Sequence, residues 1–195
     1  MEKTKQMKFK NYPKVYRIPI PEFPLTRGKH YLTEEETEKL CSGRVVIEEK
    51  VDGKIGSEYH SGYPESYLFY EFAKWKHTIP YIKLPQWKIY FDMWLLYEEE
   101  FADMGIKKFT FDKMGVPMVQ TLYDGQMSGF KELHHHLKRI LGFPSAYGDN
   151  PIEGIVVKNY PRQLLGKIVN PMFEEDMDSA GHWMKRKKER NRLAI

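Results

Sequence analysis

The stretch RVVIEEKVDG, residues 44–53, sets the expectations for the rest of the chain. Residues 44–51 are rich in β-branched side chains and predict a strand, which the turn signal Asp52-Gly53 brings to an end. Because residues i and i+2 of a strand share a face, we expect Lys50 and Asp52 to point the same way at the mouth of a cleft. Gly53 has no side chain, so a ligand can approach its backbone.

Lys50 is the candidate nucleophile of this stretch. A lysine amine attacks only when it is neutral, and burial or nearby cations lower its pKa enough to make it so. The pattern Lys-x-Asp-Gly is short, and a strand-end ion pair between Lys50 and Asp52 with no chemical role is the alternative interpretation.

Two further segments carry charged residues beside apolar strands. Residues 153–158, EGIVVK, place a carboxylate at a strand start, where Glu153 can hold Mg²⁺ beside a triphosphate. Residues 163–169, QLLGKIV, place Lys167 inside an apolar segment, where a bound phosphate gives its charge a partner. The alternative for both is a buried strand with solvated ends.

The remaining pattern predicts a mixed α+β chain rather than a βαβ array. A capping box at Thr33–Glu36 opens a short helix toward Cys41, and the Pro-rich first 30 residues predict an extended arm over the surface. Further strands are expected at 67–72, 88–96, 118–122 and 154–158, and helices at 128–141 and 174–193.

Composition excludes several classes of protein. The chain has 195 residues, of which 41% are hydrophobic and 14% aromatic, which argues against a disordered chain. No apolar run is long enough to span a bilayer, and the single cysteine excludes an internal disulfide and a multi-cysteine zinc site. We therefore expect a cytoplasmic protein with no membrane partner.

The net charge of +4 is concentrated near the C-terminus. A basic helix is expected at 181–195, and a basic helix on a nearly neutral body is typical of proteins that bind a polyanion. The candidate nucleic-acid contacts are Lys185, Arg186, Lys187 and Lys188. A solvated helix face is the alternative.

In their order and spacing, these motifs resemble those of the ATP-dependent RNA ligases of the covalent nucleotidyltransferase superfamily, above all the small phage- and archaeal-type enzymes. Residues 50–53 are similar to the family's nucleophile motif, and residues 153–158 to its EG-x-V-x-K motif. Shorter similar stretches lie at 68–71, 75–81, 90–94 and 162–173, with His182, Trp183 and Asn191 near the end.

The resemblance implies one α+β nucleotidyltransferase domain (ATP-grasp-like) over residues 1–195. It would consist of antiparallel sheets flanked by helices around an ATP cleft, without an OB domain. The implied reaction begins when Lys50 attacks the α-phosphorus of ATP and forms lysyl–AMP. AMP then passes to a 5′-phosphate end, and a 3′-hydroxyl displaces it. The implied cofactors are ATP and Mg²⁺, with Mn²⁺ as a substitute, and the implied partner is RNA, with DNA as an alternative.

The resemblance also assigns residue roles. Phe91 would stack on adenine, Glu71 would accept hydrogen bonds from the ribose, and Lys167 would neutralise the α-phosphate. Glu153 would hold the metal, and Asp52 would orient the Lys50 amine or join the metal shell. The implied ATP-binding set consists of Glu49, Lys50, Asp52, Gly53, Lys54, Glu71, Phe91, Glu153 and Lys167.

The chain departs from the family pattern at two positions where the family usually has a basic residue. Residues 51–70 contain no arginine where the family usually has one, and Leu165 stands where the last motif usually has its first lysine. Lys54 is the nearest candidate to fill the gap, and a solvated turn lysine is the alternative. A minimal DNA ligase and a degenerate module that binds nucleotide or RNA ends remain rival functions, and the oligomeric state stays open.

Overall fold

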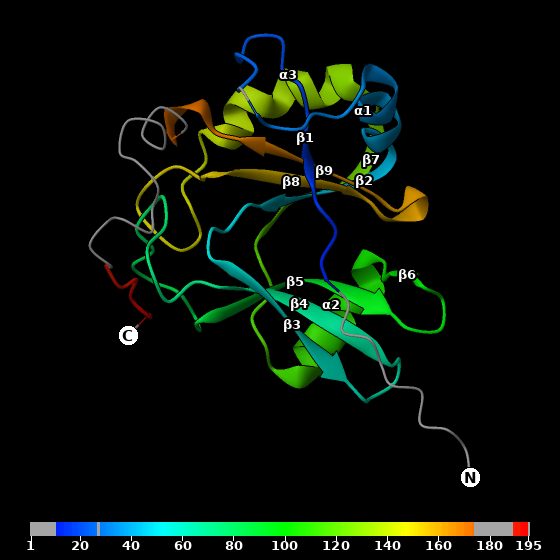
Figure 1. Cartoon of the computed structure of the whole chain (residues 1–195), viewed down its shortest axis with the longest axis vertical. Helices are drawn as coiled ribbons and strands as arrows, with labels where there is room; N and C mark the ends of the chain where they lie inside the picture. Colours follow the sequence, from blue (N-terminus) through cyan, green and yellow to red (C-terminus); the bar gives the residue numbers. More distant parts are fainter. Residues whose placement is uncertain (1–10, 27, 174–188, 195) are drawn as a thin grey trace.

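The computed structural model describes residues 11–26, 28–173 and 189–194, and two facing sheets dominate it (Figure 1). In spatial order the first sheet contains β1 (Tyr16–Arg17), β9 (Leu164–Val169), β8 (Gly154–Asn159), β2 (Ser42–Glu49) and β7 (Thr121–Ser128). The second contains β3 (Lys54–His60), β4 (Ser66–Phe72), β5 (Lys88–Leu95) and β6 (Glu100–Phe101). Only β1 and β9 pair in parallel among these strands of the described chain.

Three α-helices cover the outer faces of the two sheets (Figure 1). They are α1 (Glu34–Leu40) and α3 (Phe130–Leu141) on the first sheet and α2 (Met104–Met114) on the second, and a short 3₁₀ turn, η1 (Tyr160–Arg162), follows β8. The architecture confirms the predicted α+β class. Within the described ranges, no helix combines the length and the apolar character needed to cross a membrane.

The capping box forms as predicted. The Thr33 side chain accepts a hydrogen bond from the Glu36 backbone amide at 3.1 Å, and the Thr33 amide donates to the Glu36 carboxylate at 2.8 Å. These bonds satisfy two donors that the first turn of α1 leaves without partners. The helix ends at Leu40 with Cys41 as its C-cap, so it runs toward Cys41 as predicted.

Strand pairing shifts several boundaries that local pattern had suggested. The strand expected at 118–122 begins at Thr121 and continues to Ser128, because β7 pairs with β2 along that whole length. The helix expected from residue 128 consequently starts at Phe130. The strand expected over 44–51 covers Ser42–Glu49, so Lys50 lies just beyond its end. Neither β3 nor α2 was predicted.

Alternation along β2 divides its side chains between the two layers. Val45 and Ile47 pack in the core cluster that also holds Leu133 of α3, whereas Val46 packs in the cluster that joins the two sheets. Glu48 continues the inner face because side chains two apart share a side of the strand.

A β-bulge in β5 places two consecutive residues on the inner face. In the pairing of β4 with β5, Phe69 lies opposite Asp92 and Tyr70 lies opposite Tyr90, so Phe91 is the extra residue. Tyr90 packs toward α2, whereas Phe91 and Asp92 both face the first sheet. A bulge re-aims a side chain and interrupts the strand ladder, and this one turns Phe91 toward the space between the sheets.

A buried ionic network ties the two sheets together. Glu48 forms ion pairs with the amine of Lys107 at 2.5 Å and with that of Lys158 at 2.6 Å, and Lys158 reaches Asp92 at 3.0 Å. Tyr160 donates to Asp92 at 2.8 Å and accepts from Lys107 at 2.7 Å. The four charged side chains are at most 1% exposed, so water cannot stabilise their charges. The ion pairs and hydrogen bonds with their partners stabilise them instead.

The C-terminal helix expected over 181–195 is wrong for residues 189–194, which are extended beside residues 73–84. The buried side chain of Asn191 accepts from the Tyr81 amide at 2.9 Å and donates to the Ala73 carbonyl at 2.9 Å. These bonds satisfy backbone groups that only an extended neighbour can reach. Lys185, Arg186, Lys187 and Lys188 lie outside the described residues.

We predict that Lys107→Met lowers the free energy of unfolding by about 3 kcal/mol, because it removes one partner from a buried ion pair and leaves Glu48 undercompensated. The exposed neighbour Lys108 is the matched control, and Lys108→Met is expected to change stability by no more than about 0.5 kcal/mol. Urea denaturation of both variants measures the difference. Equal stabilities would show that the network contributes nothing to folding.

Candidate active site

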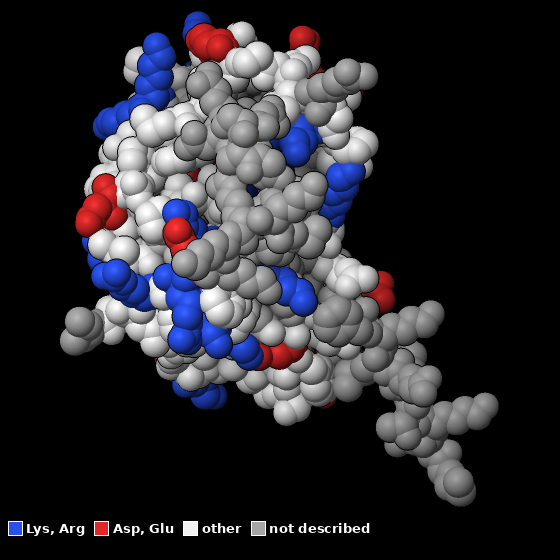
Figure 2. All heavy atoms as spheres, turned by 60° about the vertical axis from the view of Figure 1, so that its left-hand side comes forward, with Lys and Arg blue, Asp and Glu red and all other residues white. Residues whose placement is uncertain are grey.

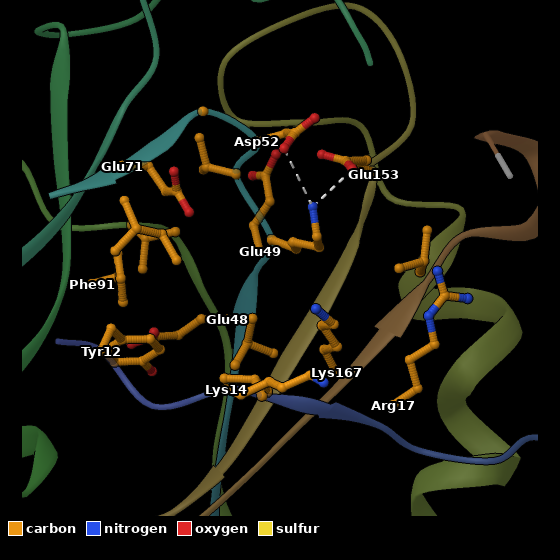
Figure 3. A pocket seen from close by; sticks show the side chains of 18 of the residues that line it. Tyr12, Lys14, Arg17, Glu48, Glu49, Asp52, Glu71, Phe91, Glu153 and Lys167 are labelled. Atoms are coloured by element: carbon orange, nitrogen blue, oxygen red, sulfur yellow. Dashed lines mark hydrogen bonds and ion pairs between the residues drawn. The ribbon is translucent and has the colours of Figure 1, made fainter. Parts of the chain in front are cut away.

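A cavity of about 650 Å³ lies between the two sheets, a volume that suits a nucleotide-sized ligand. Side chains from β2, β4, β5, β8 and β9 line it, together with residues of the N-terminal arm. In Figure 3 the acidic side chains of Asp52, Glu71 and Glu153 lie above the basic side chains of Lys14 and Lys167. The arm therefore does not simply run over the surface, as the sequence had suggested, but forms part of the cavity wall.

Lys50 lies in this cavity directly after β2. Its amine donates to Glu153 Oε1 at 2.7 Å and lies 3.9 Å from Asp52 Oδ1. Its backbone amide donates to the Gly154 carbonyl at 2.9 Å, which fixes the start of β8 beside it. The predicted proximity of Lys50 and Asp52 is confirmed, and Glu153 joins them across 103 positions of sequence.

The expected lowering of the Lys50 pKa is wrong for this arrangement. Burial by itself would lower the pKa of the amine, but the carboxylates of Glu153 and Asp52 outweigh burial and raise it. Lys50 therefore holds a proton here, and attack requires a change in the charge around it.

Two carboxylates in the cavity are held partly neutral. Burial raises the pKa of Glu153 to about 7 and that of Glu71 to about 8, against the opposing effect of the Lys50 charge. Each also has a buried Oε2 that accepts no hydrogen bond from the described residues. Mg²⁺ is usually held by one or two carboxylates and several waters, and the free Oε2 of Glu153 suits such an ion. The described residues contain no preformed cluster of three His, Cys, Asp or Glu ligands.

Asp52 is held by a segment whose role the sequence did not reveal. Thr78 donates to Asp52 Oδ2 at 2.8 Å, and His77 Nδ1 lies 3.8 Å from Oδ1. The Tyr81 hydroxyl accepts from the Asp52 amide at 2.9 Å. Burial opposes ionisation of Asp52, but Lys50, His77 and Thr78 together lower its pKa. The only signal in the sequence was the similarity of residues 75–81 to an RNA ligase stretch.

Glu49 and Gly53 line the cavity but serve structural contacts. Glu49 accepts from the Ser145 hydroxyl at 2.5 Å and from the Ala146 amide at 3.0 Å, which ties the loop before β8 to β2. A Cβ on Gly53 would lie 2.8 Å from the Phe72 carbonyl oxygen, so the backbone of β4 is what approaches it closely. The expected ligand approach at Gly53 is thus not what requires a glycine there.

Phe91 and Tyr12 form the aromatic side of the cavity (Figure 3). Their ring centroids lie 4.9 Å apart with perpendicular planes. The Phe91 carbonyl accepts from the buried amines of Lys158 at 2.7 Å and Lys107 at 3.0 Å. Because of the bulge, this carbonyl does not pair with a neighbouring strand, and the two lysines of the ionic network donate to it instead. These hydrogen bonds fix the backbone that carries the Phe91 ring.

Lys167 of β9 lies in the cavity as predicted, and Lys54 does not. Burial and the charges of Lys50 and Arg17 lower the pKa of Lys167. Lys54 is exposed at the start of β3 and is not among the lining residues. Leu165, where the family usually has a lysine, packs against the hydrophobic cluster between the sheets.

The family model described as RNA ligase matches residues 25–185, which include the motifs at 50–53, 68–71, 75–81, 90–94, 153–158 and 162–173. The chain belongs to the RNA ligase family. Membership indicates RNA ligase activity, with RNA as the partner. The chain matches no curated protein and no solved structure.

The raised pKa of Glu71 predicts a specific pH dependence of stability. Between about pH 4.5 and 8 the unfolded ligase releases the Glu71 proton while the folded one retains it, so stability falls as pH rises through this window. Glu71→Gln removes the titration and should gain about 1–3 kcal/mol relative to the parent by pH 9. Urea denaturation at pH 5, 7 and 9 measures this difference.

The exposed Glu98 supplies the control for this series, and Glu98→Gln should follow the parent at every pH. If Glu71→Gln also ran parallel to the parent, the carboxyl group would titrate alike in the folded and unfolded states, and the assignment of a raised pKa would be wrong.

Proposed function

We propose that the protein is an ATP-dependent RNA ligase that joins 5′-phosphate and 3′-hydroxyl ends through a lysyl–AMP intermediate on Lys50. The observation that carries this proposal is the half-buried Lys50 amine, 2.7 Å from Glu153, in a cavity with an aromatic side and a basic side. A lysine beside acids suits nucleophilic chemistry only if a ligand or ion changes its charge balance.

The cavity supports one orientation of ATP. Adenine would stack on Phe91, the ribose hydroxyls would donate to the free oxygen of Glu71, and the α-phosphate would lie between Lys50 and Lys167. Base stacking on an aromatic ring and charge neutralisation at phosphate are the interactions that nucleotidyl transfer needs most.

Attack would form a bond between Lys50 Nζ and the α-phosphorus and break the bond to the bridging oxygen, which leaves with pyrophosphate. Mg²⁺, or Mn²⁺ in its place, held by Glu153 and Asp52 would offset the carboxylate charges that raise the Lys50 pKa. Lys50 would then release its proton to solvent at neutral pH. Thr78 holds Asp52 in position throughout.

The face that carries residues 73–84 and 189–194 offers a path for the RNA strand. These segments lie on the left of Figure 1 and come forward in Figure 2, where Lys and Arg side chains gather in the lower part of the view. The guanidinium of Arg190 lies 5.8 Å from the Trp75 ring and 5.9 Å from the Trp87 ring. Basic and aromatic side chains together are typical of surfaces that bind single-stranded nucleic acid. Lys185–Lys188 remain predicted contacts.

One observation favours a second candidate, a module that binds nucleotide or RNA ends without joining them. Leu165 packs, partly buried, against the cluster between the sheets, so the position of the usual lysine supplies no cation to the phosphates. Incubation with α-labelled ATP followed by a denaturing gel separates the two functions, because only the enzyme gains covalent AMP.

Lys50→Ala is predicted to abolish covalent AMP transfer on such a gel, because it removes the nucleophile. Lys50→Arg should fail equally, since a guanidinium stays protonated. Lys108→Ala, an exposed lysine on α2, is the control and should label like the parent. Label that persisted on Lys50→Ala would overturn the assignment of the nucleophile.

Phe91→Ala is predicted to weaken ATP binding by about 1–3 kcal/mol, the size of one base–aromatic stacking interaction. Phe109 of α2 is 68% exposed, so Phe109→Ala is the matched control and should leave the affinity unchanged. Calorimetric titration with α,β-methylene-ATP, which cannot transfer AMP, gives both affinities. If only the melting temperature of Phe91→Ala fell, Phe91 would be a core residue without a role in binding.

A further inference from the structure

The N-terminal arm brings additional cations to the cavity, and its path is fixed on both sides. Strand β1 pairs in parallel with β9 so that Arg17 lies opposite Lys167. The Ile18 amide donates to the Lys167 carbonyl at 2.8 Å. On the other edge, the Arg17 amide donates to the His30 carbonyl at 2.9 Å, which places Lys29 beside the same strand.

Buried apolar side chains hold the N-terminal arm against β9. Ile18 and Ile20 are 2% and 4% exposed and pack in the core cluster with Leu40. A Cβ on Gly166 would lie 2.8 Å from Ile18 Cγ1, so the arm sits directly on β9. Arg17 and Lys29 are therefore held at the cavity by the fold, and both line it.

The result is a group of like charges. Residues at the same register of neighbouring strands share a face, and like charges placed directly opposite destabilise a sheet. Arg17 and Lys167 are such a pair, and Lys29 and Lys50 add to the positive charge around Lys167. The Lys167 amine makes no ion pair or hydrogen bond with any residue that the structure describes. An anion bound between these side chains would turn the repulsion into attraction.

The geometry points to the β- and γ-phosphates of ATP as that anion, and we propose that Arg17 and Lys29 bind them. This inference rests on the proposed function, in which Lys167 and Lys50 take the α-phosphate. The chain lacks both cations of the family pattern, because residues 51–70 hold no arginine and a leucine stands at position 165. Arg17 and Lys29 supply two positive charges in their place, from the arm rather than from the motifs.

The same side chains would assist the reaction. As Lys50 attacks, the bond from the α-phosphorus to the bridging oxygen breaks, and pyrophosphate keeps the electron pair and gains negative charge. Cations already in place stabilise charge that develops in the transition state. A guanidinium can also hold two phosphate oxygens at once, which fits Arg17 for the leaving group.

The test compares two nucleotides that differ only in the phosphates at issue. Calorimetric titration of the full chain with α,β-methylene-ATP and with AMP gives two affinities for each variant. Arg17→Ala is expected to weaken binding of α,β-methylene-ATP by about 10- to 100-fold, the loss that follows removal of a charge-assisted hydrogen bond. Binding of AMP should change by less than about 3-fold, since AMP lacks both phosphates.

Three variants complete the series. Lys29→Gln, at an exposed side chain, should show the same selective loss without affecting folding. Arg17→Lys should restore part of the affinity because it keeps the charge. Arg139→Ala, an exposed arginine on α3, is the matched control and should change neither affinity.

If Arg17→Ala weakened the binding of both nucleotides equally, Arg17 would only shape the cavity. If neither Arg17→Ala nor Lys29→Gln weakened the binding of α,β-methylene-ATP, the arm would not bind phosphate. Either result overturns the proposal. The 5′-phosphate of RNA is the other source of the same chemistry. Sealing of pre-adenylylated RNA needs no ATP, so Arg17→Ala should seal it at the parent rate. A loss in this reaction, with α,β-methylene-ATP affinity unchanged, would assign the cations to RNA instead.

The two proposals can fail separately. If the parent protein bound α,β-methylene-ATP with the predicted dependence on Arg17 but never gained covalent AMP, the ligase mechanism would fall and the phosphate site would stand. If covalent AMP formed at the parent rate in Arg17→Ala, with unchanged affinities, the phosphate site would fall and the ligase mechanism would stand.

Discussion

Between the two sheets, the buried carboxylate of Glu48 forms ion pairs with Lys107 of α2 and Lys158 of β8. The pair with Lys107 joins a strand of the first sheet to the helix that covers the second, and Lys158 in turn joins the first sheet to Asp92 of β5. An unpaired charge in this interior would cost several kcal/mol. Such a network tolerates only one relative position of the two sheets, because any shift would leave a buried charge without its partner. The two lysines also hold the Phe91 carbonyl, so the same contacts that fix the sheets fix one wall of the cavity.

Strand β2 and its end show how a few consecutive residues serve different parts of the molecule. Glu48 points between the sheets, Glu49 holds the loop at Ser145, and Lys50 enters the cavity. The alternation of a strand makes this division unavoidable, because neighbouring side chains must point to opposite faces. A substitution at Glu48 or Glu49 would therefore also act on Lys50 through the backbone that positions it.

Part of the candidate site could be predicted from short patterns in the sequence, because Lys50, Asp52 and Glu153 lie where strands end or begin. The roles of Glu71 and Phe91, which lie within β4 and β5, came only from the resemblance to RNA ligases. Lys50, Asp52, Glu71, Phe91, Glu153 and Lys167 were all predicted, and all line the cavity. What the sequence did not reveal depends on pairing between distant segments. The bulge at Phe91 exists only in the register of β4 against β5, and the position of Arg17 exists only in the pairing of β1 with β9. Asn191 likewise forms bonds 110 and 118 positions away, which no local helix signal near the C-terminus could indicate.

The charges in the cavity are arranged for a ligand rather than for stability. Burial raises the pKa of Glu71 and Glu153 and lowers that of Lys167, so the ionised form of each is penalised in the cavity. Lys50 is the opposite case, because the carboxylates of Glu153 and Asp52 raise its pKa and keep it protonated. In the proposed mechanism, the phosphates of ATP would compensate the basic side and a divalent cation would compensate the acidic side. The cation would also offset the carboxylate charges that hold the proton on Lys50. Binding and activation would then be one electrostatic event, and the amine would become a nucleophile only when its target is in place.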